Sequence, residues 1–313
     1  MKNKAFQIFS FIFLLYVVDH LVGAALKELY FSQKVGTAGQ LNYTMLEAKE
    51  DIIILGNSRA QHHYNNKIIS DSTGMSCYNG GMDGGYGIWL PYAITDAILK
   101  RYKPKLIVVE FNPASLGYWK SSYEKMAILL PYKNEFDVCR SLAASRSNLE
   151  KIKWISNIYP YNSMVYGLTT NKIFEKRLKH VVGFMPILNK TLSPANDTAA
   201  LFDNYTNYSD SLNANSLASL ITLCKSNSVK LLFVNSSIFA GKSLRLINQT
   251  IAAQKALQMI KDAGFQYWDF TSDSCIVTNA SYFADQLHLN NTGADYYSTI
   301  FSNMLKIFIR EIL

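Results

Sequence analysis

The chain has 313 residues, of which 49% are hydrophobic and 17% charged, so it is neither disordered nor collagen-like and has enough apolar material for a sizeable buried core. Its net charge of +8 is spread along the sequence without a basic block interleaved with aromatic residues, which argues against nucleic acid as a partner. Its four cysteines form no CxxC pair, which argues against a zinc cluster.

An apolar stretch from Ala5 to Leu26 follows two lysines at the amino end. Thirteen of its 22 residues are Phe, Ile, Leu or Val, and Asp19 is its only charged residue. The apolar side chains favour membrane insertion by roughly 4 to 8 kcal/mol, whereas one Asp at mid-span costs about 2.5 to 3.5 kcal/mol. The stretch is therefore predicted to be a transmembrane anchor, since about 20 residues span a bilayer.

The amino-terminal lysines predict an inside amino end, which leaves the chain after the anchor outside the cytoplasm, in the periplasm or at the cell surface. Residues 1–4 would be a cytoplasmic tip, 5–26 the single membrane span and 27–49 a polar tether. Two alternatives stay open. The small residues of Val22-Gly23-Ala24 could serve a signal peptidase, and the stretch could instead be a buried core helix.

Short apolar runs alternate with helical stretches through most of residues 50–313. The runs expected as strands are 51–56, 75–80, 105–111, 230–235 and 266–270. The stretches expected as helices are 88–101, 213–227, 248–263 and 291–313. This alternation predicts an α/β domain with a parallel sheet and helices on both faces, which carries its ligands at the carboxyl ends of the strands. Residues 114–212 interrupt the alternation, and we interpret them as an insertion or cap on the same domain.

Polar residues and glycines stand where the first three expected strands end. Ser58 follows the first strand, and a Ser there points its hydroxyl over the sheet edge, near helix amides that stabilise an oxyanion. Glycines in residues 79–85 follow the second strand and allow close backbone approach. Asn112 follows the third strand and could donate a hydrogen bond. Each feature has a plainer explanation, because Ser is a common helix N-cap and both Gly and Asn-Pro are common in turns.

Asp285-Gln286-Leu287-His288 precedes the last expected helix. Residues three apart on a helical turn lie close enough for one carboxylate to hold one imidazole. Such a pair is the base and the orienting acid of a nucleophilic triad, in which His takes the serine proton and Asp fixes the imidazole tautomer. The plainer alternative is an ordinary loop His near a helix cap. No other histidine has a comparable carboxylate spacing.

The order of these motifs resembles the SGNH (GDSL-like) hydrolase superfamily over about residues 50–312. The resemblance implies a flavodoxin-like three-layer sandwich in which Ser58 is the nucleophile and Asp285 and His288 are the base pair. It also implies that Gly84 and Asn112 are oxyanion donors alongside the Ser58 amide, with Gly84 placed five residues after Asn79. It implies no metal and no cofactor. The sequence departs from the family in having Gly-Asn-Ser for Gly-Asp-Ser, and Phe before Asn112.

The Gly-x-Ser-Arg form with an amino-terminal anchor looks like the branch related to surface-polymer O-acyltransferases. The resemblance therefore implies a serine esterase or O-acyltransferase that acts on an ester of a cell-surface glycan or similar substrate, with a membrane acyltransferase as a possible partner. Two alternatives remain. The domain could be a non-catalytic binding or scaffolding module for such an acyltransferase, or an α/β domain in which the motif residues coincide by chance.

Overall fold

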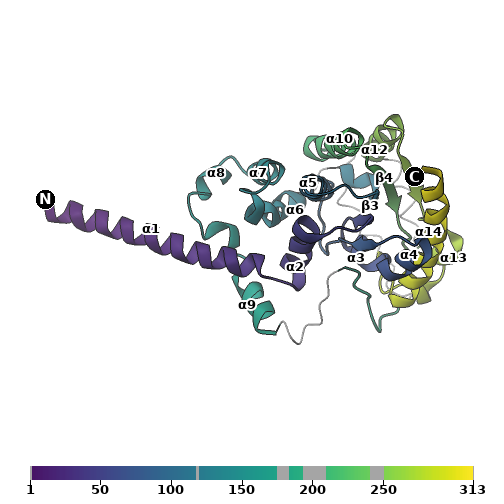
Figure 1. Cartoon of the computed structure of the whole chain (residues 1–313), viewed down its shortest axis with the longest axis horizontal. Helices are drawn as coiled ribbons and strands as arrows, with labels where there is room; N and C mark the ends of the chain where they lie inside the picture. The colour runs from purple at the N-terminus through teal and green to yellow at the C-terminus, as the bar shows by residue number, and fades with distance from the viewer. Residues whose placement is uncertain (1, 118–119, 175–182, 193–208, 240–249, 313) are drawn as a thin grey trace. The chain divides into compact units, whose positions relative to one another are not determined.

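The computed structural model describes all residues except 1, 118–119, 175–182, 193–208, 240–249 and 313 (Figure 1). The chain forms two compact units, and each contains two stretches of sequence. Met1–Asn42 and Tyr123–His180 form one unit, named the anchor unit below. Tyr43–Ser122 and Val181–Leu313 form the other, named the sheet unit.

Five parallel strands make up the sheet in the order β2-β1-β3-β4-β5. The strands are β1 (Ile52–Leu55), β2 (Cys77–Asn79), β3 (Leu106–Glu110), β4 (Lys230–Asn235) and β5 (Gln266–Asp269). In β1, which pairs with β2 on one side and β3 on the other, Ile54 lies opposite Asn79 and Val108. This is the flavodoxin-like strand order of doubly wound sheets, so the predicted parallel α/β sheet is confirmed.

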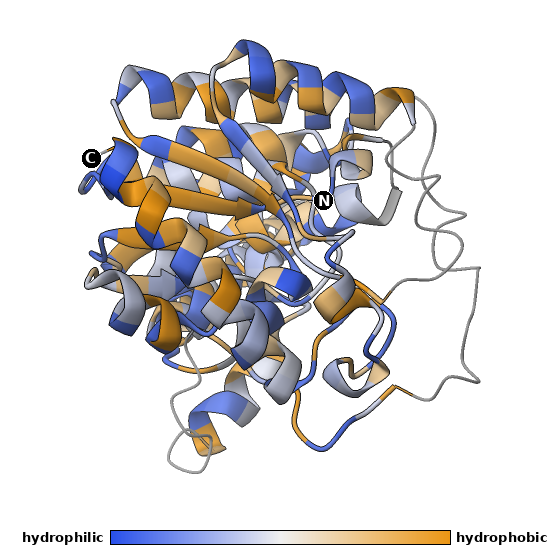
Figure 2. Ribbon diagram, turned by 90° about the vertical axis from the view of Figure 1, so that its right-hand side faces the viewer, coloured by the Kyte–Doolittle hydropathy of each residue, from blue (hydrophilic) through white to orange (hydrophobic). Residues whose placement is uncertain are grey.

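Both faces of the sheet are buried, which explains why its inner strands are continuous apolar runs rather than alternating ones. Ile52 and Ile54 face a core that includes Tyr297 and Phe301 of α14, and every one of these side chains is fully buried. Ile53, which points to the opposite face because strand side chains alternate, is equally buried. Figure 2 shows the strands as a hydrophobic layer between amphipathic helices.

The helices of the sheet unit divide between these two faces. α14 packs against α3 and α4, whereas α10 packs against α5 and α12. The helices are α3 (Ser58–His63), α4 (Asn66–Thr73), α5 (Trp89–Leu99), α10 (Ser211–Ser226), α12 (Ile251–Asp262), α13 (Ser274–Val277) and α14 (Asn291–Ile312), with a π-helix η1 (Tyr43–Glu47) and 3₁₀ turns η2 (Pro113–Leu116) and η7 (Ala280–Tyr282). The three layers place the carboxyl ends of β1, β3 and β4 at one edge.

The described residues of the anchor unit form helices joined by turns and irregular segments. Its first helix, α1 (Lys2–Phe31), is long and apolar enough to cross a membrane, and only 6% of its most apolar window is buried. The remaining elements are α2 (Gly36–Asn42), η3 (Met126–Tyr132), α7 (Asp137–Ala144), α8 (Glu150–Lys153), η4 (Tyr159–Tyr161) and α9 (Val165–Phe174), and α6 (Lys120–Lys125) crosses the boundary between the units. The high exposure of α1 does not fit a buried core helix.

Two expected segments look different in detail. Residues 27–49, expected as a polar tether, contain the end of α1 followed by α2 and η1, and their Leu41 and Met45 are fully buried. The described part of the expected insertion at 114–212 holds short helices, and its residues 123–180 group with the anchor unit. The expected domain boundaries themselves stay predictions.

Candidate active site

The turn between β1 and α3 brings Ser58 to the edge of the sheet. Gly56 has φ +148°, and a Cβ there would lie 2.8 Å from the Cβ of Glu110, so the turn requires glycine. Asn57 caps the helix, because its Oδ1 accepts a hydrogen bond from the Arg59 amide at 3.2 Å. α3 therefore begins at Ser58, which lies in the first helical turn, at the positive end of the helix dipole.

Ser58, His288 and Asp285 form one continuous hydrogen-bonded relay. The Ser58 Oγ lies 2.8 Å from Nε2 of His288. On the other side of the imidazole ring, Nδ1 lies 2.9 Å from each carboxylate oxygen of Asp285. A carboxylate only accepts hydrogen bonds, so Nδ1 carries the proton and Nε2 is left to accept the serine hydroxyl proton. The geometry is that of a nucleophile, its base and an orienting acid.

A bend positions Asp285 and His288, where the sequence suggested a helical turn. Asp285 Oδ1 accepts the backbone amides of Leu287 and His288, each at 2.9 Å, so the carboxylate also holds the bend together. Burial opposes ionisation of this carboxyl, but its hydrogen bonds to the His288 ring and to the two amides outweigh burial and lower its pKa below the ordinary value. Asp285 therefore stays ionised, as stabilising an imidazolium requires.

His63 lies beneath the relay and was not singled out by its sequence. Its ring is fully buried, with Nδ1 2.8 Å from the Ser236 hydroxyl, and its Nε2 accepts the Leu289 amide at 3.1 Å. Burial, with the nearby His288 and Arg59, holds the pKa of His63 well below the usual value. His63 is thus a neutral structural group that fixes the residue after His288.

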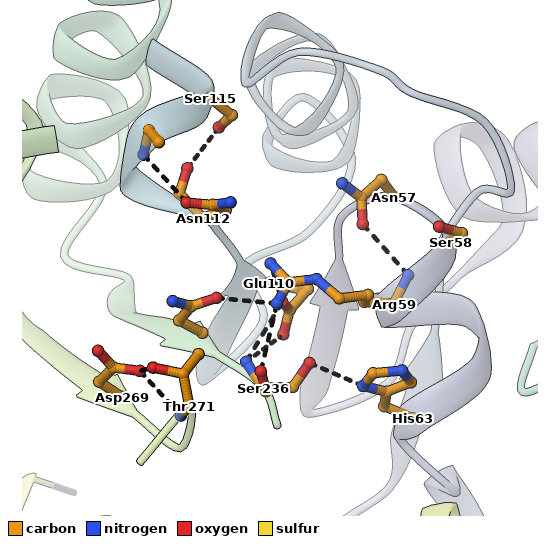
Figure 3. A network of polar contacts seen from close by, with 12 residues as sticks. Asn57, Ser58, Arg59, His63, Glu110, Asn112, Ser115, Ser236, Asp269 and Thr271 are labelled. Carbon is orange, nitrogen blue, oxygen red and sulfur yellow. Dashed lines mark hydrogen bonds and ion pairs between the residues drawn. The ribbon is translucent and has the colours of Figure 1, made fainter. Parts of the chain in front are cut away.

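A buried ion pair lies under the start of α3, between two residues that no local sequence pattern links. The Arg59 guanidinium lies 2.9 Å from Oε1 of Glu110, at the end of β3, and both side chains are almost wholly buried. Arg59 also donates to Oδ1 of Asn235, and Glu110 accepts the backbone amide of Ser236 (Figure 3). The pair therefore joins the carboxyl ends of β3 and β4 to the helix that carries Ser58.

Asn112, one of the two expected oxyanion donors, lies at the start of η2, just after β3. Its Oδ1 caps η2 by accepting the Ala114 amide at 3.0 Å, which leaves the Nδ2 end of the side chain facing Asn57 in Figure 3. Asn57 and Asn112 line the same cleft of about 300 Å³, together with Tyr86. Asn112 therefore shares a cleft with the residue before Ser58, and its role as an oxyanion donor stays a prediction.

Gly84, the other expected donor, lies in the loop after β2. It has φ +129°, and the ring of Tyr86 lies against it. The loop contacts α3 three residues earlier, at Gly81, where an added Cβ would lie 2.3 Å from the Gln61 amide nitrogen. The role of Gly84 as a donor stays a prediction. Within the described part of the chain, no group of three or more His, Cys, Asp or Glu residues could hold a metal ion.

Comparison with solved structures found similar chains of low identity. A protein described as an acylhydrolase from Bacteroides fragilis is 12% identical, with 83% of this chain and 86% of that chain covered and a TM-score of 0.36. An acetyl xylan esterase is 11% identical (80% and 98% covered, TM-score 0.39), and a GDSL-like lipase from Bacteroides thetaiotaomicron is 12% identical (84% and 88% covered, TM-score 0.37). No family model and no curated protein matches this chain. Function is therefore derived from the residues of the site.

Proposed function

We propose that the chain is a membrane-anchored serine esterase or O-acyltransferase of the SGNH (GDSL-like) type. The observation that carries this proposal is the relay from Ser58 through His288 to Asp285, with 2.8 Å between the serine oxygen and Nε2. Residues 230 apart in sequence meet at this contact, at the edge where doubly wound sheets bind their ligands.

The relay supports acyl transfer in two steps. In the first, the Ser58 oxygen attacks the ester carbonyl while Nε2 of His288 takes its proton, and the imidazolium then protonates the departing alcohol. In the second, water or a sugar hydroxyl gives its proton to Nε2 and attacks the acyl carbonyl, and the imidazolium returns that proton to the Ser58 oxygen as the acyl–oxygen bond breaks. The Ser58 amide, Gly84 and the Asn112 amide would stabilise the oxyanion, and each such donor is typically worth about 10² to 10³ in rate.

The apolar α1 supports attachment to a membrane as a span or signal anchor. Its lysines at the amino end favour an inside amino terminus, which would place the sheet unit outside the cytoplasm. There it would meet acylated cell-surface glycans, and we propose these or similar esters as substrates. A sugar hydroxyl as the second acceptor would make the same site a transferase.

The second candidate is a non-catalytic scaffolding module for a membrane acyltransferase. It is favoured by one observation, that Asp285 bonds the backbone of its own bend as well as the His288 ring. A module that had lost its activity would therefore still need this carboxylate for structure. Such a module would have no reason to hold the Ser58 hydroxyl at hydrogen-bond distance from Nε2 of His288.

Labelling with a fluorophosphonate probe tests the proposal on the full chain in detergent micelles. The probe should label the wild-type protein and fail to label Ser58→Ala. The matched control is Ser72→Ala, in α4 and outside the relay, which should label like the wild type. Undiminished labelling of Ser58→Ala would overturn the assignment of the nucleophile, and an unlabelled wild type that also turns over no acetyl ester would favour the scaffold.

Adding a polyol acceptor then separates hydrolysis from transfer, because a transferase yields an acylated polyol.

A further inference from the structure

Exposed large apolar side chains gather in one part of the anchor unit. Apart from α1, the described residues include twelve such side chains, and seven of them fall within residues 149–174. The other five are scattered over the sheet unit, as is ordinary for a protein surface. The seven are Leu149, Ile152, Ile155, Val165, Tyr166, Ile173 and Phe174. Such a concentration of exposed apolar side chains indicates a surface that contacts a membrane or another protein.

Three of these residues form a row, named the apolar ridge below. Ile152 donates its amide to the Leu149 carbonyl at 3.1 Å, and Ile155 donates to the Ile152 carbonyl at 3.2 Å. Turns bonded from i to i+3 stack these side chains one above the next. The three are 61%, 60% and 81% exposed, so the whole ridge faces outward.

The opposite side of the same segment is fixed by charge. Glu150 is 1% exposed and accepts from Arg146 at 2.7 Å, from Lys153 at 3.1 Å and from the Tyr159 hydroxyl at 2.6 Å. Because this carboxylate is buried and bonded on several sides, the segment cannot rotate to turn the apolar ridge inward without leaving a buried charge unpaired.

The residues directly after the apolar ridge hold α1. The carboxylate of Asp19 accepts the Ser156 hydroxyl, the Asn157 backbone amide at 2.7 Å, the Asn157 side-chain amide at 3.1 Å and the Ile158 amide at 3.4 Å. One turn further along α1, a Cβ on Gly23 would lie 2.4 Å from the Asn157 Cβ. The apolar ridge is thus attached beside residues 19–23 of α1.

The length of α1 sets the depth of this attachment. From Lys4 to Val18 the helix rises only about 22 Å, at about 1.5 Å per residue, which is shorter than a hydrocarbon core of about 30 Å. A span of about 20 residues from Lys4 ends near Gly23. Leu21 and Val22 are also exposed, at 65% and 41%. The membrane boundary therefore falls at the level of Asp19 and the apolar ridge, and the four donors satisfy the carboxylate there.

We propose that the apolar ridge is a lipid-binding surface that enters the interfacial region of the same bilayer that α1 spans. Leu149, Ile152 and Ile155 lie among the upper acyl chains, and the exposed Lys151 reaches the headgroup phosphates. Apolar side chains with neighbouring lysines are the chemistry that interfacial segments use. The inference rests on the proposed membrane anchoring and is independent of the proposed esterase activity.

Site-directed fluorescence quenching on the full chain in lipid nanodiscs tests the inference. Of the four cysteines, only Cys275 is exposed, so Cys275→Ser gives a background for single labelled positions. Ile155→Cys reports the apolar ridge and Phe13→Cys the membrane span. Ile307→Cys is the matched control, since Ile307 is an exposed isoleucine (60%) on α14 of the sheet unit. Each labelled protein is exposed to nanodisc lipid that carries doxyl groups both near the headgroup and near the middle of the acyl chain and, separately, to aqueous iodide.

The doxyl lipid should quench the labels at positions 13 and 155 by about twofold or more, because both would lie in the bilayer, while iodide quenches only the label at 307. If iodide quenched the label at 155 while the doxyl lipid still quenched the label at 13, the lipid-binding surface would be overturned and the membrane anchor would stand. Protection of 155 from both quenchers would overturn it in favour of a covering protein. If the label at 13 were not lipid-quenched, anchoring itself would fail. Fluorophosphonate labelling of Ser58 in the same nanodiscs reports the esterase proposal separately.

Discussion

The groups around the first residue of α3 and those around the residues that follow it differ in their exposure to solvent. Ser58, at its first residue, meets a partly exposed imidazole and an Asp285 side chain that is 54% exposed. One residue later Arg59 enters a buried network with Glu110, and His63 is wholly buried. The difference teaches that the groups proposed to react lie at the rim, where an ester can reach them, and the polar groups that hold them lie beneath, without access to solvent.

Removing the base at the rim should have the largest effect. His288→Ala should lower kcat for acetyl-ester hydrolysis by about 10⁴- to 10⁶-fold, because His288 is the base that the described residues place against the Ser58 hydroxyl. Steady-state kinetics on the full chain in micelles measure this. His62→Asn is the control. The His62 ring also packs near His288 but bonds the Met185 carbonyl, so its loss should cost less than about tenfold. Similar losses in both variants would contradict the relay.

Neutralising the orienting acid should have the next largest effect. Asp285→Asn should lower kcat by about 10³- to 10⁴-fold, because an amide does not stabilise the imidazolium and can leave the wrong nitrogen protonated. The lowered pKa of Asp285 has a matching consequence for stability. Its contribution is present above the ordinary carboxyl pKa and is lost as the pH falls through the lowered folded value. A variant with wild-type kcat would show that Asp285 serves the bend alone.

Breaking the buried network should affect stability before chemistry. Glu110→Gln should lower the free energy of unfolding by about 3 to 5 kcal/mol, because it leaves the Arg59 charge buried without its partner. Denaturant or thermal unfolding of the full chain measures the change. Asp71→Asn is the control, since it breaks the exposed pair with Lys67 and should leave stability nearly unchanged. Equal free energies of unfolding for the two variants would show that the Arg59–Glu110 pair contributes no more to stability than an exposed ion pair.

The smallest expected effect is a pH slope from His63. Its lowered pKa means that, below about pH 6.5, the unfolded chain binds a proton that the folded chain does not. Stability should therefore decrease as the pH falls, by at most about 1.4 kcal/mol per pH unit from this group. His63→Gln keeps a polar side chain and should make the melting temperature depend less steeply on pH between 8 and 5. An unchanged slope would show that His63 does not titrate on unfolding.

The sheet could be predicted because its strands are short apolar runs ending in Gly, Asn or Asn-Pro. The expected 105–111 became Leu106–Glu110 and the expected 266–270 became Gln266–Asp269, so only the ends moved. Ser58, Asp285 and His288 could be predicted because their signals are local: a serine three residues after the end of β1, and a carboxylate three residues before a histidine. Their meeting follows from strand ends sharing one edge.

The supporting groups could not be predicted in this way. Arg59 and Glu110 are 51 residues apart, and nothing near either one indicates the other. The only sequence signal was a charged residue closing an apolar strand, which must find a partner if it is buried. The contact of Asp19 with residues 156–158 is a second example. In the sequence this carboxylate is only a cost to membrane insertion, and nothing near it indicates its hydrogen-bond donors. A contact between two single polar residues that are far apart in the chain leaves no periodic pattern in the sequence, so it could not be predicted.

The contact between Gly81 and α3 limits how this chain can vary. One methyl group at that position would collide with the Gln61 amide and press on the helix whose first residue is Ser58. A displacement of the loop after β2 would therefore displace α3 and Ser58 with it. A longer or bulkier loop must therefore leave Gly81 unchanged and grow from the residues that follow it, beginning at the exposed Asp83.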